Sequence, residues 1–314
     1  MTLSRLRNLA TVSALVSGAL IFTTGCERKA PATRVDTAST KPESASVAQL
    51  SPTQRSGWNG SAGPALLIQG ETRDEAIVLM PTEDDSADGA RLEALGAQGA
   101  AVTLYGRGGG RLVGQLGVAP PSPDAECRLW PLRAVRGEGT ANLWAVGFVG
   151  GQTAPLPLDS VDALSPRDST ALVAEASRLA SMVTTITDPS FQGLRFTAHD
   201  IRRFEASPGV QAIVAHLVRK VNQEANPQEE QTLLIAERDS GITTGPYQLA
   251  YAERTHGLEE QSTTSEVIAA VSIAGHPTII VARDSDAGVA YVMLERTETR
   301  RWRIRWTSAL TRCG

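Results

Sequence analysis

Glutamates gather in the C-terminal half of the chain in an arrangement compatible with general acid–base chemistry. Glu229 and Glu230 are adjacent, Glu237 and Glu253 are each followed by an arginine, and Glu260 lies four residues after His256. Enzymes that hydrolyse glycans need two carboxyl groups about 5 to 9 Å apart. These five glutamates are therefore the candidate catalytic carboxylates of a hydrolase.

A Glu-Arg dipeptide recurs where strands are expected to end. The three copies begin at Glu237, Glu253 and Glu295. Adjacent residues of a strand point to opposite faces of the sheet. We therefore expect the three glutamates to share one face and their arginines to share the other.

Arginines also alternate with large apolar residues near the C-terminus. Arg301, Arg303 and Arg305 alternate with Trp302, Ile304 and Trp306. The aromatic residues should enter the core. The arginines would repel one another unless anions lie between them. We expect glutamates of neighbouring strands to form a salt-bridge lattice with them. The alternative is an anion-binding groove, because arginine binds phosphate and carboxylate bidentately.

Other motifs do not indicate a cofactor or a metal. The glycine-rich segment 106–110 is followed by neither Lys-Ser/Thr nor a helical pattern, so it predicts a hairpin turn instead of a phosphate loop. The four histidines lack the spacing of metal ligands. No G-x-S-x-G nucleophile motif occurs. We therefore predict no cofactor and no metal.

The N-terminus has the pattern of an export signal. Arg5 and Arg7 precede an apolar stretch from Leu9 to Phe22, and charged residues resume at Glu27. A spanning helix needs about 20 apolar residues, and this stretch is shorter. The pattern is typical of a cleaved secretory signal peptide. An uncleaved membrane anchor is the alternative.

The segment Thr23-Thr24-Gly25-Cys26 resembles the lipobox of bacterial lipoproteins. Thr23 stands where that motif usually has leucine. The resemblance implies that residues 1–25 are removed and that Cys26 carries fatty-acyl chains such as palmitate. More than one chain gives stable membrane anchoring. Glu27 in place of aspartate implies the outer membrane, with the chain facing the periplasm.

Lipidation of Cys26 leaves Cys127 and Cys313 in an oxidising compartment, where two cysteines commonly pair. Such a disulfide would tie the C-terminus to the N-terminal half. Two buried free thiols are the alternative, because sequence does not give their geometry.

Composition divides the exported chain into a tether and a folded part. Residues 26–60 are rich in Ala, Ser, Thr and Pro and cannot form a core, so they predict a disordered tether with a span of about 30 Å. The rest is long enough for one large or two small domains. A net charge of −4 gives no indication of nucleic-acid binding.

Residues 61–158 predict a small all-β domain. Six short apolar runs separated by Gly and Pro predict a small antiparallel barrel or sandwich. The expected strands are 65–68, 76–80, 101–105, 112–118, 127–132 and 143–149.

Residues 159–314 predict an antiparallel meander with one packed helix, so the class is α+β and β-rich. Ser165 as N-cap, Pro166 and Asp168 mark the start of the helix, and Asp188-Pro189 stops it. Residues 210–221 fit either a helix or a strand. Segments 233–240 and 279–285 resemble each other, which predicts two hairpins side by side.

Three functions are compatible with these features. The first is a non-enzymatic binding or assembly module anchored in the cell envelope, with an envelope glycan, a lipid headgroup or a protein as partner. The second is a periplasmic hydrolase that uses paired carboxylates on a glycan. The third is a structural partner that pairs through an exposed sheet edge.

Overall fold

The computed structural model describes residues 57–81, 85–118, 131–138, 143–183, 189–221, 227–241 and 245–310. All of them lie within one compact unit, Ala45–Gly314. Cys26, Cys127 and Cys313, the signal peptide and nearly all of the tether lie outside the described residues, so lipidation and disulfide pairing stay predictions. Among the described helices, none has the length and apolar character needed to cross a membrane.

The N-terminal strands close into a six-stranded antiparallel barrel in the order β1-β2-β5-β4-β3-β6. Its interior is a cluster of apolar residues that includes Leu67, Val78, Leu104 and Val135. The barrel expected from the sequence is confirmed. The strands are β1 (Leu66–Gln69), β2 (Glu75–Leu79), β3 (Ala101–Tyr105), β4 (Arg111–Leu116), β5 (Leu132–Glu138) and β6 (Val146–Val149).

One strand of the barrel differs from the expected range, and the turn at residues 106–110 is as predicted. The fifth strand begins at Leu132, the last residue of the expected run 127–132. The glycine-rich segment is the predicted turn between β3 and β4. The Gly106 N–H donates to the Gly110 carbonyl at 2.8 Å, and Gly109 has a φ of +82°, which favours glycine.

A helix between β2 and β3, α2 (Asp85–Ala97), was not predicted from the sequence. Among residues 90–97 of this helix, whose side chains are described, Leu92 is buried in the barrel core and Leu95 packs against it. A Cβ at Gly96 would lie 2.8 Å from the Gly117 carbonyl oxygen, so a larger residue would push the helix away from the end of β4. The helix therefore has few apolar residues at helical spacing, and the sequence gives little periodicity from which to predict it.

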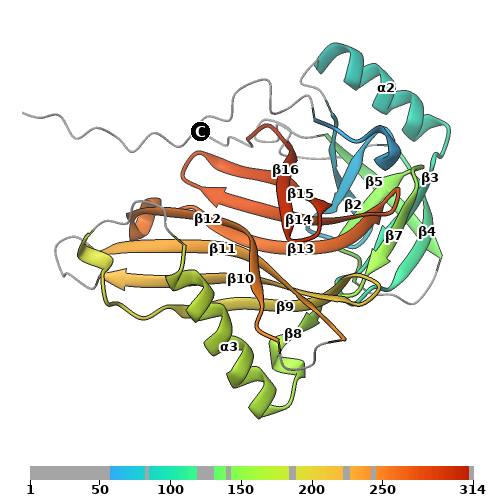
Figure 1. Cartoon of the computed structure of the whole chain (residues 1–314). Coiled ribbons are helices and arrows are strands. Elements are labelled where there is room, and N and C mark those ends of the chain that lie inside the picture. The colour runs from blue at the N-terminus through green and yellow to red at the C-terminus, as the bar shows by residue number, and fades with distance from the viewer. Residues whose placement is uncertain are drawn as a thin grey trace, which may run out of the picture. The chain divides into compact units, whose positions relative to one another are not determined.

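The rest of the chain forms two five-stranded antiparallel sheets (Figure 1). The outer sheet has the order β12-β11-β10-β9-β8, and the inner sheet has the order β16-β15-β14-β13-β7. Each is a four-stranded meander with one short edge strand. The strands are β7 (Thr153–Leu156), β8 (Asp159–Ser160), β9 (Thr197–Ser207), β10 (Val210–Val221), β11 (Gln228–Asp239), β12 (Gln248–Leu258), β13 (Thr264–Ile273), β14 (His276–Ser285), β15 (Gly288–Glu298) and β16 (Arg301–Thr307).

Both sheets are covered on two faces. Val214 and Ile235 of the outer sheet pack against Val281 and Leu294 of the inner sheet. The opposite face of the inner sheet, which includes Met293, packs against the outside of the barrel. The layers therefore run from barrel to inner sheet to outer sheet, and a helix covers the last face.

That helix is α3 (Pro166–Ser181), which lies across the outer sheet in Figure 1. Its start is as predicted: the Ser165 hydroxyl accepts from the Asp168 N–H at 3.2 Å and donates to the Asp168 carboxylate at 2.8 Å. Leu172 and Leu179 pack on Ile213 of the sheet. The helix ends at Ser181, before the expected stop at Asp188-Pro189.

Burial on both faces explains the ambiguity of residues 210–221, which form strand β10. Ile213 and Leu217 face α3, whereas Ala212 and Val214 face the inner sheet. A strand that is covered on both sides has a continuous apolar sequence instead of an alternating one. The similar segments 233–240 and 279–285 form β11 and β14, in separate sheets that face each other. The expectation that their hairpins lie side by side was wrong.

The last strand contains a β-bulge that the alternating sequence does not reveal. Ile304 pairs with Leu294, but Trp306 pairs with Met293, so Arg305 is an extra residue. Trp302 therefore enters the core between the sheets, while Trp306 faces the barrel and meets Trp58 edge-on at 5.0 Å. The expected aromatic face is split between two cores, because a bulge reverses the alternation beyond it.

The expected domain boundary at residue 158 lies close to strand β7. The edge strand β7 precedes the expected boundary at residue 158, but it pairs with β13 of the inner sheet. The division into two domains stays a prediction. The α+β, β-rich class is confirmed by the barrel, the two sheets and helices α2 and α3.

Ser165→Ala should lower the free energy of unfolding by about 1 kcal/mol, because α3 loses its N-cap. Ser181→Ala at the other end of α3 is the matched control, since that hydroxyl only contacts the Ser177 carbonyl. We expect it to change stability by less than about 0.5 kcal/mol. Chemical denaturation of the full chain measures both, and equal losses would contradict the capping role.

Candidate functional site

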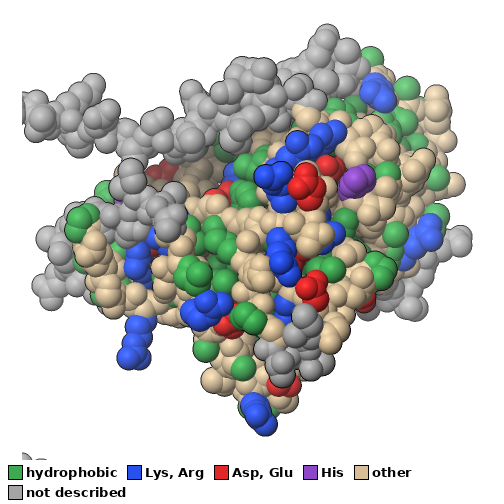
Figure 2. Space-filling model, in the orientation of Figure 1, with side chains coloured by type: hydrophobic (Ala, Val, Ile, Leu, Met, Phe, Trp, Pro, Cys, Tyr) green, Lys and Arg blue, Asp and Glu red, His purple; other side chains and the backbone are tan. Residues whose placement is uncertain are grey.

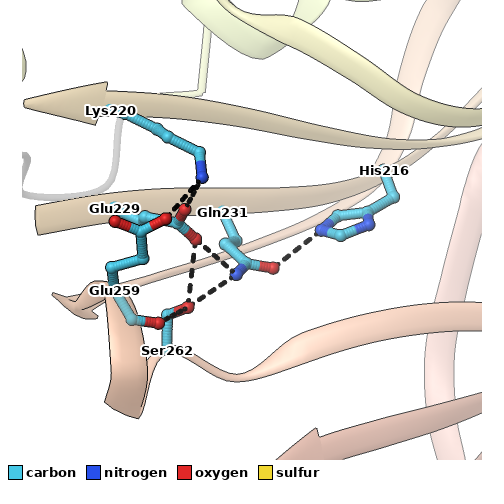
Figure 3. A network of polar contacts seen from close by, with 6 residues as sticks. All are labelled: His216, Lys220, Glu229, Gln231, Glu259 and Ser262. Carbon is cyan, nitrogen blue, oxygen red and sulfur yellow. Dashed lines mark hydrogen bonds and ion pairs between the residues drawn. The ribbon is translucent and has the colours of Figure 1, made fainter.

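Glu229 belongs to a polar network at one end of the outer sheet (Figure 3). It forms an ion pair with Lys220 on the neighbouring strand β10. It also accepts hydrogen bonds from Gln231 and Ser262, both at 3.2 Å. Lys220 reaches Glu259 as well, at 2.9 Å. Glu259 and Ser262 lie in the connection from β12 to β13, so the network holds that connection against the sheet.

The protonation states in this network follow from its contacts. Burial opposes the ionised form of Glu229, but Lys220, Ser262 and Gln231 together hold its pKa below the usual value. Burial lowers the pKa of His216, against the opposing effect of its 2.8 Å hydrogen bond to Gln231. His216 therefore stays neutral at pH 7 and donates from Nε2. A carboxylate with a lowered pKa is a poor general base near neutral pH.

Glu230 lies on the opposite face of the outer sheet, fully buried beneath α3. Its Oε1 atom is 2.7 Å from Arg219 and 3.2 Å from Arg254. Arg254 also donates to the Ala180 carbonyl at 2.6 Å, near the C-terminus of α3. The negative end of the helix dipole favours a cation there. Arg219 lies over the ring of Phe196 at 4.8 Å. The two arginines thus surround the carboxylate and leave it no route to a substrate.

Glu237 connects the two sheets. Its oxygens accept from Nε and a terminal nitrogen of Arg296 at 2.8 and 2.9 Å. It also accepts from the indole of Trp302 at 2.6 Å and from the Arg300 backbone at 2.9 Å. Burial raises the pKa of Glu237, but these donors outweigh burial and the net shift is downward. The side chain is an inter-sheet cross-link with a filled hydrogen-bond capacity.

The remaining two glutamates differ from each other. Glu253 forms an ion pair with Arg283 of the inner sheet and accepts from the Tyr251 hydroxyl at 2.6 Å. Glu260 is exposed in the short 3-10 helix η5 (Glu259–Gln261). The five candidate carboxylates are therefore dispersed over both faces of the outer sheet and the connection from β12 to β13.

The three Glu-Arg dipeptides follow the predicted alternation only in the outer sheet. Glu237 and Glu253 point to the inner sheet, while Arg254 points to α3. The third dipeptide is reversed, because Arg296 points inward to Glu237 and Glu295 pairs with Arg305. The expectation of one glutamate face was therefore wrong for Glu295. Glu237 and Arg296, taken as members of separate repeats, are partners of each other.

The arginines of β16 lie at the edge of the inner sheet, mostly against their own acids. Arg301 is 3.4 Å from Glu298, and both side chains are exposed. Arg305 is 3.9 Å from Glu295. Arg303 is exposed. On the face seen in Figure 2, acidic side chains lie next to basic ones. These contacts favour the salt-bridge interpretation over an anion-binding groove.

A pocket of about 410 Å³ opens between α3 and the outer sheet. One wall is the first half of α3, and the other consists of strand residues and the segment before β12. It is lined by Leu164, Asp168, Ala171, Leu172, Glu175, Arg203, Arg238, Gly245, Pro246 and Tyr247. Its volume lies in the range of small-molecule sites.

The pocket combines apolar walls with two guanidinium groups. Arg238 lies over the ring of Tyr247 at 4.4 Å. It donates from Nε to the amide oxygen of Gln211 at 2.9 Å, and the Tyr247 hydroxyl donates to the same oxygen at 2.8 Å. Burial raises the pKa of Tyr247, while Arg238 and Arg203 oppose that effect. Tyr247 therefore stays protonated and positions Arg238.

Sequence reasoning missed the arginines and the tyrosine of this pocket. Arg203 and Arg238 have nothing in their local sequence that separates them from the chain's other arginines. Their proximity results from strand pairing, since Arg203 pairs with Ile213 and Arg238 with Gln211, both on β10. The only early signal was the apolar face of α3, which includes Leu172.

In the part of the chain that the structure describes, no group of three His, Cys, Asp or Glu residues is arranged to hold a metal ion. Comparison of the chain with protein-family models, with curated proteins and with solved structures found no match. The residues of this chain are therefore the basis for any functional proposal.

Glu237→Gln should lower the free energy of unfolding by about 3 to 5 kcal/mol, because Arg296 stays nearly buried without its counter-charge. Glu298→Gln is the matched control, since it breaks the exposed pair with Arg301. The control should cost less than about 1 kcal/mol. Chemical denaturation of the full-length variants measures both values, and similar losses would contradict the buried role of Glu237.

The contribution of Glu237 should also depend on pH. A carboxyl with a lowered folded-state pKa adds stability above its unfolded pKa and loses it as pH falls through the folded pKa. The ordinary value is 4.5. The difference in stability between the wild-type chain and Glu237→Gln should therefore narrow as the pH falls below that value. A difference that stays constant from neutral to strongly acidic pH would refute this assignment.

Proposed function

We propose that this chain is a lipid-anchored, non-enzymatic binding module of the bacterial cell envelope. The proposed lipid anchor is based on the lipobox-like segment that ends at Cys26. The proposed distance of the folded part from the membrane is based on the predicted tether over residues 26–60. The observation that supports binding is the pocket between α3 and the outer sheet, where Arg238 has a neutral amide instead of a carboxylate as its nearest partner.

The arrangement of the carboxylates weighs against the hydrolase. A catalytic acid needs a raised pKa and its partner a clear path to the substrate. Glu229 and Glu237 instead have lowered pKa values, and Glu230 is buried between two arginines. These contacts therefore favour binding without turnover over a hydrolase that uses these carboxylates.

The anchor is tested by metabolic labelling with a fatty-acyl probe in a Gram-negative host. The wild-type chain should incorporate the label and stay with washed membranes. Cys26→Ser should lose the label, because the thiol that accepts the acyl chain is gone. Cys127→Ser is the matched control and should keep it. Labelling of the Cys26→Ser variant at wild-type level would overturn the proposed anchor.

The absence of turnover is tested with the purified full-length chain in detergent. After incubation with fragments of peptidoglycan, mass spectrometry should detect no product that depends on the chain. Glu229→Gln tests a catalytic carboxylate, and Glu298→Gln, which changes an exposed pair, is the matched control. A product that forms with the wild-type chain and with Glu298→Gln but not with folded Glu229→Gln would establish the hydrolase instead.

A further inference from the structure

The pocket between α3 and the outer sheet contains separate cationic and acidic sides. Arg203 and Arg238 come from β9 and β11, which flank β10. Asp168 and Glu175 come from α3 on the other side. Neighbouring strands are about 4.8 Å apart, so the two arginines start roughly 10 Å apart on the sheet. Long guanidinium side chains bridge that distance easily.

Arg238 is placed for a ligand more firmly than a surface arginine. The ring of Tyr247 lies against one face of its guanidinium, and Gln211 accepts its Nε–H. No described carboxylate lies within ion-pair distance of it. A fixed guanidinium loses little conformational entropy when it binds a carboxylate. Its charge also helps to lower the pKa of Glu175, but that carboxylate is hydrogen-bonded mainly to Arg178. Arg238 therefore has the geometry to receive an anion.

Arg203 is only loosely neutralised. Among the described residues it forms an ion pair with Asp159 of the two-residue strand β8, at 3.5 Å, and the Asp159 side chain is 58% exposed. Exposed pairs of this kind contribute little energy. Arg203 lines the pocket, so it adds a second guanidinium group to the lining that contains Arg238.

The acidic side limits the charge of the ligand. Glu175 is bound by Arg178 at 2.8 Å and accepts from the Tyr247 backbone at 3.1 Å. Asp168 is exposed; its carboxylate accepts from the Ser165 hydroxyl, and its backbone N–H donates to the same hydroxyl. Two arginines and two acids give the lining no net charge. A phosphate dianion would meet repulsion from the acids, whereas a zwitterion would find a partner at each end.

The backbone around the pocket is irregular on two strands. The pairing of β9 with β10 shifts between Val210 and Gln211, and the pairing of β11 with β12 shifts between Ile235 and Ala236. Bulges redirect side chains and are frequent beside binding sites. The first shift lies at Gln211, the residue that holds both Arg238 and Tyr247, and the second lies two residues before Arg238 on β11.

We propose that this pocket binds an amino acid or short peptide in its zwitterionic form. Its carboxylate lies between Arg203 and Arg238, its ammonium group is near Asp168, and its apolar portion contacts Leu172 and Pro246. This inference rests on the proposed binding function and names the class of ligand for the same module.

The test is calorimetric titration of the purified full-length chain with dipeptides of Ala, Leu and Phe at up to millimolar concentration. Amidating the C-terminus or acetylating the N-terminus removes one charge at a time. The free dipeptides should bind, and each modified form should bind about tenfold more weakly or worse. Binding of the amidated form at full strength, or of inorganic phosphate as well as the dipeptides, would overturn the assignment.

Variants of the chain locate the site. Arg203→Gln and Arg238→Gln should each weaken dipeptide binding about tenfold or more. Arg301→Gln is the matched control, because it removes an exposed arginine on the far edge strand β16. Circular dichroism melts identify any variant that fails to fold, and Arg203→Gln keeps the test valid because its pair with Asp159 is exposed. Unchanged binding by folded Arg203→Gln and Arg238→Gln would refute the site.

The two proposals fail in different ways. If no dipeptide binds, the pocket inference is wrong, while acyl labelling at Cys26 still decides the anchor. If a dipeptide binds and is cleaved, the ligand class stands and the non-enzymatic function is overturned.

Discussion

The inner sheet has the barrel on one face and the outer sheet on the other, and this double burial constrains the rest of the fold. Ile280 and Met293 fill the core toward the barrel, while Ile279 and Val292 fill the core toward the outer sheet. Strands in such a position have to be apolar on both sides. Any charge that enters these layers requires a partner in the same layer, since an isolated buried ion costs several kcal/mol.

The acids that enter these layers meet this requirement by pairing with basic residues. Glu237 leaves the outer sheet and meets Arg296 of the inner sheet, and Glu253 does the same with Arg283. Glu230 on the helix-covered face is matched by two arginines, one of which, Arg254, also donates to the Ala180 carbonyl near the end of α3. These contacts hold the layers in register. They also give candidate catalytic residues a structural part in the fold: Glu230 is fully buried, and the donors around Glu237 hold its pKa below the usual value.

The success of sequence reasoning depended on how local each signal is. The barrel strands and the start of α3 come from short patterns, such as the Ser165 cap and the turn at Gly109, and they were predictable. The bulge at Arg305 was not, because one extra residue in β16 is defined only by its pairing with β15. The Glu237–Arg296 contact spans 59 residues of sequence and two sheets. The pocket residues depend on the same long-range pairing, so no local pattern marks Arg203 or Arg238.

Arg238 is the informative exception to the pairing rule. Arg219 and Arg254 on the α3 side of the outer sheet pair with Glu230, whereas the partners described for Arg238 are the Gln211 amide and the face of Tyr247. Neutral partners stabilise a guanidinium less than a carboxylate does. The chain nevertheless fixes this arginine with two side chains beside an open pocket. Residues that depart from such stabilising arrangements occur most often at functional sites. A ligand carboxylate would supply the stabilisation that a structural carboxylate supplies elsewhere, which is why we place the proposed binding site at this arginine.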